Sequence, residues 1–118
     1  MRKLIVTYEQ FEVVVVPFPF TDSSATKKRP ALVISDASAF NKSTKKSVMA
    51  MITTASHSSW VLDIPITDLK SAGLQANSIV RMKLFTLDDA LVLKKIGKLA
   101  TSDRDRVQKS LQQLFNLG

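Results

Sequence analysis

Arg29 lies where a polar loop meets an apolar run, at the end of three adjacent cations in the segment 27–35 (KKRPALVIS). Because Pro30 follows, the backbone of Arg29 is pushed away from the α region toward an extended conformation, which restricts where its guanidinium can point. A planar, permanently charged fork on a strand is suited to binding phosphate or carboxylate. The segment therefore predicts an anion-binding arginine at a fixed place.

Two hydroxyl groups, those of Thr53 and Thr54, end a second apolar run, 47–54 (SVMAMITT). If this run and the strand of Arg29 are neighbours in a sheet, a guanidinium and one or two hydroxyls share one rim, which suits a phosphate. A second interpretation stays open, and the spacing alone favours it: the two threonines are ordinary β-branched strand residues and the arginine is a solvated cation.

The chain lacks the residues that several other kinds of functional site require. One histidine and no cysteine exclude disulfides, thiolate zinc sites and a cysteine nucleophile. The ten acidic residues are scattered, and their only adjacent pair is Asp88 and Asp89, so we expect no metal and no other cofactor. There is no Gly-x-Ser-x-Gly elbow, and three glycines in all form no phosphate-binding loop.

The formal net charge of +7 favours a polyanionic partner over charge that serves solubility alone. His57 has an ordinary pKa near neutrality, so it can transfer protons or be a solvent-facing loop residue, and the second is favoured. Aromatic rings can stack on unpaired bases, although core packing is favoured for the two phenylalanines among them: Phe18, Phe20 and Trp60. Cations that can follow a nucleic-acid backbone are Lys27, Lys28, Lys45, Lys46, Arg81 and Lys83.

Short apolar runs separated by turn residues predict a mainly β protein that positions these groups. The expected strands are 13–22, 27–35, 47–54, 60–66, 78–85 and 91–99. The segments 36–46, 55–59 and 86–90 are expected to be loops or turns. Arg81 and Lys83 alternate by twos, which predicts that both lie on one face of their strand.

Two helices are expected besides the strands. Thr67 to Gly73 reads as one helical turn that begins at the Thr67 hydroxyl and ends at the glycine. Ser102 and Asp105 resemble a capping box, and apolar residues follow at helical spacing: Val107, Leu111, Leu114 and Phe115. The predicted architecture is a single domain, 1–118: a small curved antiparallel sheet with a C-terminal amphipathic helix over an open face or edge. No run approaches the ~20 apolar residues of a membrane span, and we expect a cytoplasmic protein.

Four of these segments resemble the MazF/PemK family of type II toxin–antitoxin systems. In the family's order they are VPFPFTD ending at Asp22, KRPALVIS ending at Ser35, AMIT ending at Thr53, and 78–87 leading to KKIGK at 94–98. The resemblance covers about Phe11 to Leu117, and the Arg-Pro segment is its most specific part. In one departure, Gln10-Phe11-Glu12 stands where members usually place a glycine beside an acidic residue.

This resemblance implies a compact barrel of the CcdB/PemK type and an endoribonuclease that cuts single-stranded RNA, often messenger RNA, without a metal. The family's catalytic arginine corresponds to Arg29 and its catalytic threonine to Thr53. It also implies a homodimer and an acidic antitoxin that blocks the RNA groove, with DNA contacted only through the antitoxin and no membrane partner. Further candidates for RNA binding are Asp22, Lys27, Lys28, Thr54, His57, Trp60, Arg81 and Lys83.

A second function on the same scaffold stays open, because the related CcdB group acts on gyrase. That alternative is a toxin or regulatory module that binds a protein target and has no cleavage chemistry.

Overall fold

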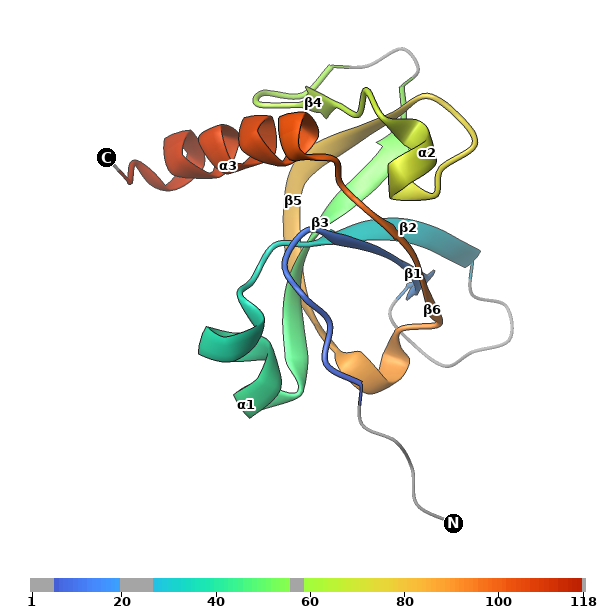
Figure 1. Ribbon diagram of the computed structural model, residues 1–118, viewed down its shortest axis with the longest axis vertical. Coiled ribbons are helices and arrows are strands. Elements are labelled where there is room, and N and C mark those ends of the chain that lie inside the picture. The colour runs from blue at the N-terminus through green and yellow to red at the C-terminus, as the bar shows by residue number, and fades with distance from the viewer. Residues whose placement is uncertain (1–5, 20–26, 56–58, 118) are drawn as a thin grey trace.

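The computed structural model describes residues 6–19, 27–55 and 59–117. Six strands of this part of the chain form one antiparallel sheet in the order β4–β5–β3–β2–β1–β6. Their bounds are β1 Glu12–Phe18, β2 Lys27–Val33, β3 Lys46–Thr54, β4 Ile64–Pro65, β5 Ser78–Asp88 and β6 Lys94–Lys98. The sheet curls on itself and a C-terminal helix leaves one side of it (Figure 1). The predicted fold class is confirmed.

The central strands are buried on both faces, which explains why β1 has a run of valines rather than an alternating pattern. Val13 belongs to one core with Leu32 and Ile52, whereas Val14 belongs to a second core on the other face with Met49. The first core is covered by the residues around β4, by helix α2 (Leu69–Ala72) and by the C-terminal helix. Tyr8 and the segment after β5 close the second.

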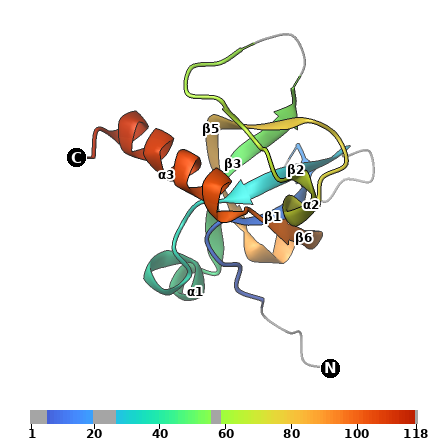
Figure 2. The same ribbon diagram turned by 45° about the horizontal axis from the view of Figure 1, so that its top comes forward.

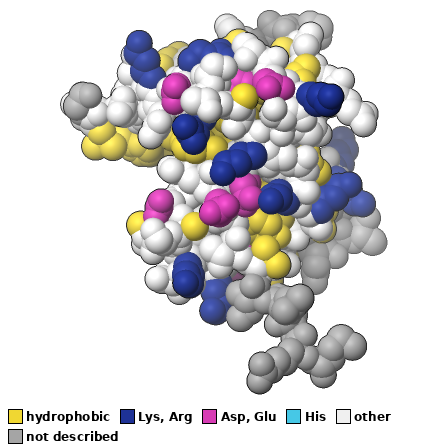
Figure 3. Space-filling view, viewed as in Figure 1, with side chains coloured by type: hydrophobic (Ala, Val, Ile, Leu, Met, Phe, Trp, Pro, Cys, Tyr) yellow, Lys and Arg dark blue, Asp and Glu magenta, His cyan; other side chains and the backbone are white. Residues whose placement is uncertain are grey.

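Helix α3 (Thr101–Phe115) is the predicted C-terminal helix, but its first turn differs from the prediction. Ala100 precedes it without a side-chain cap, so the capping box at Ser102 and Asp105 was wrong. The helix packs on the body through the fully buried Val107 and, one turn further on, through the half-buried Leu111. The last apolar residues of its C-terminal half, Leu114 and Phe115, are exposed. Figures 1 and 2 show this half running out from the sheet, and Figure 3 shows a hydrophobic strip along it.

The segment 36–46, predicted as a loop, is helical. A π-helical turn at Ala37–Asn41 continues into α1 (Lys42–Thr44). The Asp36 carboxylate accepts a hydrogen bond from the Ala39 N–H at 2.7 Å, and the fully buried Asn41 amide donates to the Tyr8 carbonyl at 2.8 Å. Small polar residues that favour loops also cap helices, and tertiary contacts decide between the two outcomes.

The predicted strand 60–66 is mostly a turn, and only Ile64–Pro65 pairs with β5. Leu62 has φ 68°, which breaks an extended run. Pro65 has no N–H, and its carbonyl accepts a hydrogen bond from Arg106 at 3.1 Å, so this edge of the sheet is closed to further strands. The turn predicted at 86–90 begins later, because β5 continues to Asp88 and a single 3₁₀ turn, Asp89–Leu91, follows.

Helix α2 begins at a different residue from the one predicted and ends at the predicted residue. Its N-cap is Asp68, whose carboxylate accepts from the Ser71 N–H at 3.0 Å, and not Thr67. Gly73 ends the helix with φ 74°, as predicted. At Gly97 in β6, an added Cβ would lie 2.4 Å from the carbonyl carbon of Ala72, so α2 packs backbone to backbone on this strand.

The entry turn before β1 explains the departure at Gln10-Phe11-Glu12. Phe11 has φ 72°, the left-handed conformation that glycine adopts without steric cost. Its N–H donates to the Val33 carbonyl at 2.7 Å and its carbonyl accepts from Leu99 at 3.0 Å. The ring is buried in the first core, at 4% exposure. Phe11 is therefore tolerated in this conformation, because core packing offsets a backbone strain of about 1–2 kcal/mol.

Candidate functional site

Arg29 lies on β2 directly across from Val16 of β1, so its side chain shares the face of the second core. Its guanidinium carbon lies 5.4 Å from the centroid of the Phe18 ring, within cation–π range. The Nε atom is buried and has no hydrogen-bond partner among the described residues. Buried polar atoms are nearly always paired, so an unpaired donor at this place is unusual and suits a site that binds an anion.

Phe18 was predicted to pack in a core, and that prediction was wrong. The ring is 38% exposed at the end of β1 and lies under the guanidinium of Arg29. Because the ring fixes one side of the fork, it limits the directions in which Arg29 can bind a ligand.

Thr53 lies on β3, which is the sheet neighbour of β2. The recorded register pairs Ala31 with Met51, and continuing it by two residues places Arg29 across from Thr53. Side chains at positions related by this register point to one face of the sheet. Thr53 is half-buried, while Thr54 is exposed and follows on the opposite face of the strand.

Arg81 reaches the same face from β5, where it pairs with Met51. Its Nε and one terminal nitrogen donate to the two oxygens of Asp63 at 3.1 and 2.9 Å. Both side chains of this bidentate pair are only 13% exposed. The hydrogen bonds to Asp63 raise the pKa of Arg81 further, so the guanidinium is permanently charged.

Trp60 lies against two cations of β5. The ring centroid is 4.7 Å from Nζ of Lys83 and 5.7 Å from the guanidinium carbon of Arg81. Contact with one ring places Arg81 and Lys83 on the same side of β5, as their alternation predicted. The residue itself is 47% exposed, so a large part of its surface is open to solvent.

The remaining candidates are distributed unevenly around this face. Lys27 and Lys28 are exposed at the start of β2, opposite Phe18 and Pro17 of β1. Lys45 and Lys46 lie at the far end of β3, about 23 Å from Thr53 at the usual rise per residue. Lys46 is paired there with Asp88. Three predicted residues, Phe20, Asp22 and His57, lie outside the described residues.

Sequence reasoning missed Asp63, which binds Arg81. One signal was present, since Asp63 is a single acidic residue inside the apolar run 60–66 (WVLDIPI). Its partner lies 18 residues away in the sequence, so the pair itself could not be read from local pattern.

Within the described ranges, no three His, Cys, Asp or Glu side chains are grouped so that they could hold a metal ion. The same part of the chain has no helix long and apolar enough to cross a membrane. The site is therefore built from cations, hydroxyls and aromatic rings: Arg29, Thr53, Arg81, Lys83, Phe18 and Trp60.

These features define a small basic β protein with a cationic face on a curled antiparallel sheet. The chain belongs to the PemK-like, MazF-like toxins of type II toxin–antitoxin systems, whose family model matches residues 9–115. No curated protein matches the sequence.

Solved structures of such toxins share the fold. MazE–MazF from Deinococcus radiodurans has a TM-score of 0.74 at 16% identity, over 96% of this chain and 100% of that one. The Mycobacterium tuberculosis toxin MazF-mt6 has a TM-score of 0.70 at 19% identity, over 91% and 98%. An endoribonuclease in complex with its cognate antitoxin, from a mycobacterial species, has a TM-score of 0.71 at 13% identity, over 95% and 96%.

Proposed function

We propose that this toxin is an endoribonuclease that cuts single-stranded RNA, in particular messenger RNA, in the cytoplasm and without a metal. The observation that carries the proposal is the buried, unpartnered Nε of Arg29 on the face that Thr53 shares. A fixed cationic donor beside a hydroxyl is suited to an RNA phosphate, and the flanking cations and open ring suit a strand whose bases are unpaired.

In the proposed reaction, the ribose 2′-oxygen attacks the adjacent phosphorus and gives its proton to water, while the bond from phosphorus to the 5′-oxygen breaks and the leaving 5′-oxygen takes up a proton from water. The products are a 2′,3′-cyclic phosphate and a 5′-hydroxyl. Negative charge builds on the phosphoryl oxygens in the transition state, and Arg29 meets it with N–H donors. Thr53 hydrogen-bonds the phosphate or orients the 2′-hydroxyl, since it is too weak a base to remove the proton unaided.

The test of this assignment replaces Arg29. Arg29→Ala should lower cleavage of a single-stranded RNA at least ~100-fold, as the loss of one strong transition-state donor does, with thermal unfolding nearly unchanged. Arg29→Lys should also be impaired, because a point charge does not reproduce the fork. Lys46→Ala is the matched control, since it removes a cation from the far end of the sheet. Near-normal cleavage by a folded Arg29→Ala protein would overturn the assignment.

A second experiment tests the nucleophile. Cleavage should continue in the presence of a chelator and stop when the ribose upstream of the scissile phosphate is replaced by deoxyribose. Cutting of the deoxy substrate, or inhibition by the chelator, would mean that an activated water attacks and that these roles are wrong. A folded protein that cuts no RNA would favour the alternative of a toxin acting on a protein such as gyrase.

The proposal includes two partners. One is a second copy of the chain, with RNA crossing the interface between the two copies. The other is an acidic antitoxin that covers the cationic face. DNA is contacted only through this antitoxin. The net charge of +7 supports the second, because steered association between opposite charges slows as salt rises. Association with the antitoxin should therefore slow markedly between low and physiological salt, and sedimentation at micromolar concentration should show a dimer.

A further inference from the structure

A single carboxylate, that of Asp63, joins two parts of the site. One oxygen accepts from Nε of Arg81 at 3.1 Å. The other accepts from a terminal nitrogen of Arg81 at 2.9 Å and from the backbone N–H of Trp60 at 2.9 Å. Asp63 thus ties the backbone that carries the indole ring to the guanidinium that lies against the ring.

In this arrangement the backbone of Trp60 is fixed by hydrogen bonds, whereas its ring is exposed to solvent. The Asp63 N–H donates in return to the Trp60 carbonyl at 3.1 Å, so the two residues form a tight turn. The ring is 47% exposed, although two cations hold it from β5. A tryptophan that served only to fill a core would be buried. Here the backbone and the cations keep an exposed aromatic ring in a defined place.

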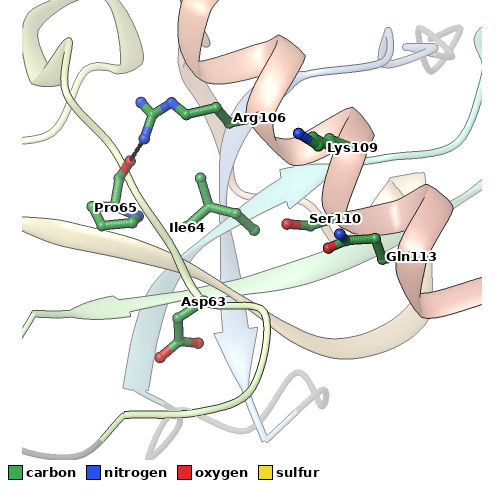
Figure 4. A pocket seen from close by; sticks show the side chains of 7 residues that line it. All are labelled: Asp63, Ile64, Pro65, Arg106, Lys109, Ser110 and Gln113. Atoms are coloured by element: carbon green, nitrogen blue, oxygen red, sulfur yellow. Dashed lines mark hydrogen bonds between the residues drawn. The ribbon is translucent and has the colours of Figure 1, made fainter.

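The carboxylate of Asp63 points toward the side of the molecule that carries Arg81 and Trp60. The next residues, Ile64 and Pro65, line a groove against α3 with Arg106 and Lys109. Figure 4 shows the Asp63 side chain pointing away from both of these cations, and Arg106 bonds to the Pro65 carbonyl instead. The cation with which Asp63 pairs is therefore Arg81, on the face that Thr53 shares.

The ring is connected to the proposed reaction centre through Arg81 and β3. Arg81 pairs with Met51, which precedes Thr53 by two residues and points to the same face of β3. Two residues along a strand span about 7 Å. A base next to a phosphate bound at Arg29 and Thr53 can therefore reach the Trp60 ring.

We propose that Asp63 is a positioning residue, which holds Trp60 as a stacking platform for one unpaired base beside the scissile phosphate and so sets the preference for that base. This inference rests on the proposed ribonuclease function. Stacking on a held ring favours purines over pyrimidines, because the larger ring system covers more of the indole, and an abasic nucleotide is the poorest ligand.

The chain has one tryptophan, so its fluorescence reports on Trp60 alone. The probe is an end-labelled oligoribonucleotide made uncleavable by a deoxyribose at the scissile position, with label anisotropy measuring binding. Wild-type emission should be quenched on binding, and an abasic nucleotide at one position next to the scissile phosphate should remove the quenching. Binding without any quenching overturns this inference alone. No binding by anisotropy overturns the ribonuclease function and this inference together.

Cleavage of an abasic series separates positioning from simple structural support. For the wild type, kcat/KM should fall about 10-fold when the stacked base alone is removed. Trp60→Ala should cut the intact RNA about 10-fold more slowly and be insensitive to that removal, whereas Trp60→Phe should keep part of the sensitivity. Asp63→Asn should lose most of the sensitivity, and Asp63→Glu, which keeps the carboxylate, should recover part of it.

The matched control is Asp88→Asn, which breaks an ion pair at the opposite end of the β3–β5 pair. It should keep both the cleavage rate and the full 10-fold abasic effect. If Asp63→Asn folds and keeps the full effect as well, Asp63 does not position the ring and the inference is overturned. An abasic effect that persists undiminished in Trp60→Ala would equally overturn it, because the base would then be recognised elsewhere.

Discussion

Two buried aspartates, Asp103 in α3 and Asp89 after β5, differ in how many hydrogen bonds their carboxylates accept. Asp103 accepts hydrogen bonds from the Thr67 N–H, the Thr67 hydroxyl and the Asp68 N–H at 2.7–3.1 Å, and it pairs with Arg106. Asp89 accepts one hydrogen bond, from the Ser47 hydroxyl at 2.7 Å. Its other oxygen is buried and has no partner among the described residues.

The contrast reverses the pKa shifts of the two groups. Burial acts to raise the pKa of Asp103, but the N–H groups of Asp68 and Thr67, the hydroxyl and Arg106 outweigh it and hold this pKa below its ordinary value. Burial also acts to raise the pKa of Asp89, and one hydroxyl does not offset it, while the nearby charge of Asp88 raises it further. Burial alone thus does not set the sign of a shift; the number of fixed donors does.

The two regions also differ in what they hold together. Asp103 fastens the first turn of α3 to the chain between β4 and α2, far from it in sequence, so its hydrogen bonds stabilise the packing of three elements. Asp89 begins the short turn after β5 and bonds to the neighbouring strand β3. We expect the first region to be sensitive to substitution and the second to be tolerant.

The largest effect is expected from Asp103→Ala. It removes the only carboxylate on which these donors converge and leaves buried N–H groups unpaired, which should lower the free energy of unfolding by about 3–5 kcal/mol. Asp103→Asn should cost less but still more than 1 kcal/mol, since its amide offers one acceptor oxygen where several donors meet. Urea unfolding measures both. A loss below about 1 kcal/mol for Asp103→Ala would break the comparison.

Acid unfolding should distinguish the two carboxylates by sign. Because the pKa of Asp103 is lower in the folded state, its stabilisation is present above the unfolded value near ~3.9 and is lost as pH falls through the folded value. Asp103→Asn should therefore show a shallower loss of stability below about pH 4 than the wild type. An identical acid dependence in urea unfolding would show that Asp103 is not the group that titrates.

Asp89→Asn should change stability at neutral pH by less than about 1 kcal/mol and in the stabilising direction, because it removes a poorly paired buried charge. The pKa of Asp89 is raised, so its contribution is present below the unfolded value and is lost as pH rises through the folded value. Relative to the wild type, Asp89→Asn should therefore gain stability as the pH rises above about 4. A clear destabilisation at pH 7 would mean that the charged form is well solvated in the fold.

The smallest effect is expected at Asp88, beside Asp89 in sequence. Its ion pair with Lys46 is about half-exposed on both sides. Exposed pairs contribute little, so Asp88→Asn should change the unfolding free energy by less than about 0.5 kcal/mol, and moderate salt should remove the difference. A loss of unfolding free energy that does not depend on salt would show that this pair behaves like a buried one, and that exposure does not decide how much a pair contributes.

Local pattern was sufficient for much of the fold. The valine-rich run of β1 and the apolar runs of β2, β3 and β5 became strands because β-branched residues favour extended backbone and both sheet faces needed covering. The polar loop between the first two apolar runs predicted that β1 and β2 are consecutive strands. Local pattern failed at 36–46 and 60–66, where short polar or mixed segments took the conformation that their distant partners required.

The candidate site divides in the same way. The residue types and the order of the segments placed Arg29 and Thr53 on consecutive strands, because Pro30 makes the backbone extended and a strand has a fixed two-residue period. Antiparallel pairing of those strands then brings the two to one face. This part depends on chain neighbours and short connections, which a sequence contains.

Contacts between distant segments needed the folded chain. The exposure of Phe18 beneath Arg29, the Asp63–Arg81 pair across 18 residues and the Thr67–Asp103 bonds across 36 residues have no local signature. Each depends on strand register, on a bulge between β3 and β5, and on where α3 docks. The energies of these contacts arise from desolvation and from the geometry of converging donors, and both come into being only when segments far apart in the sequence are packed together.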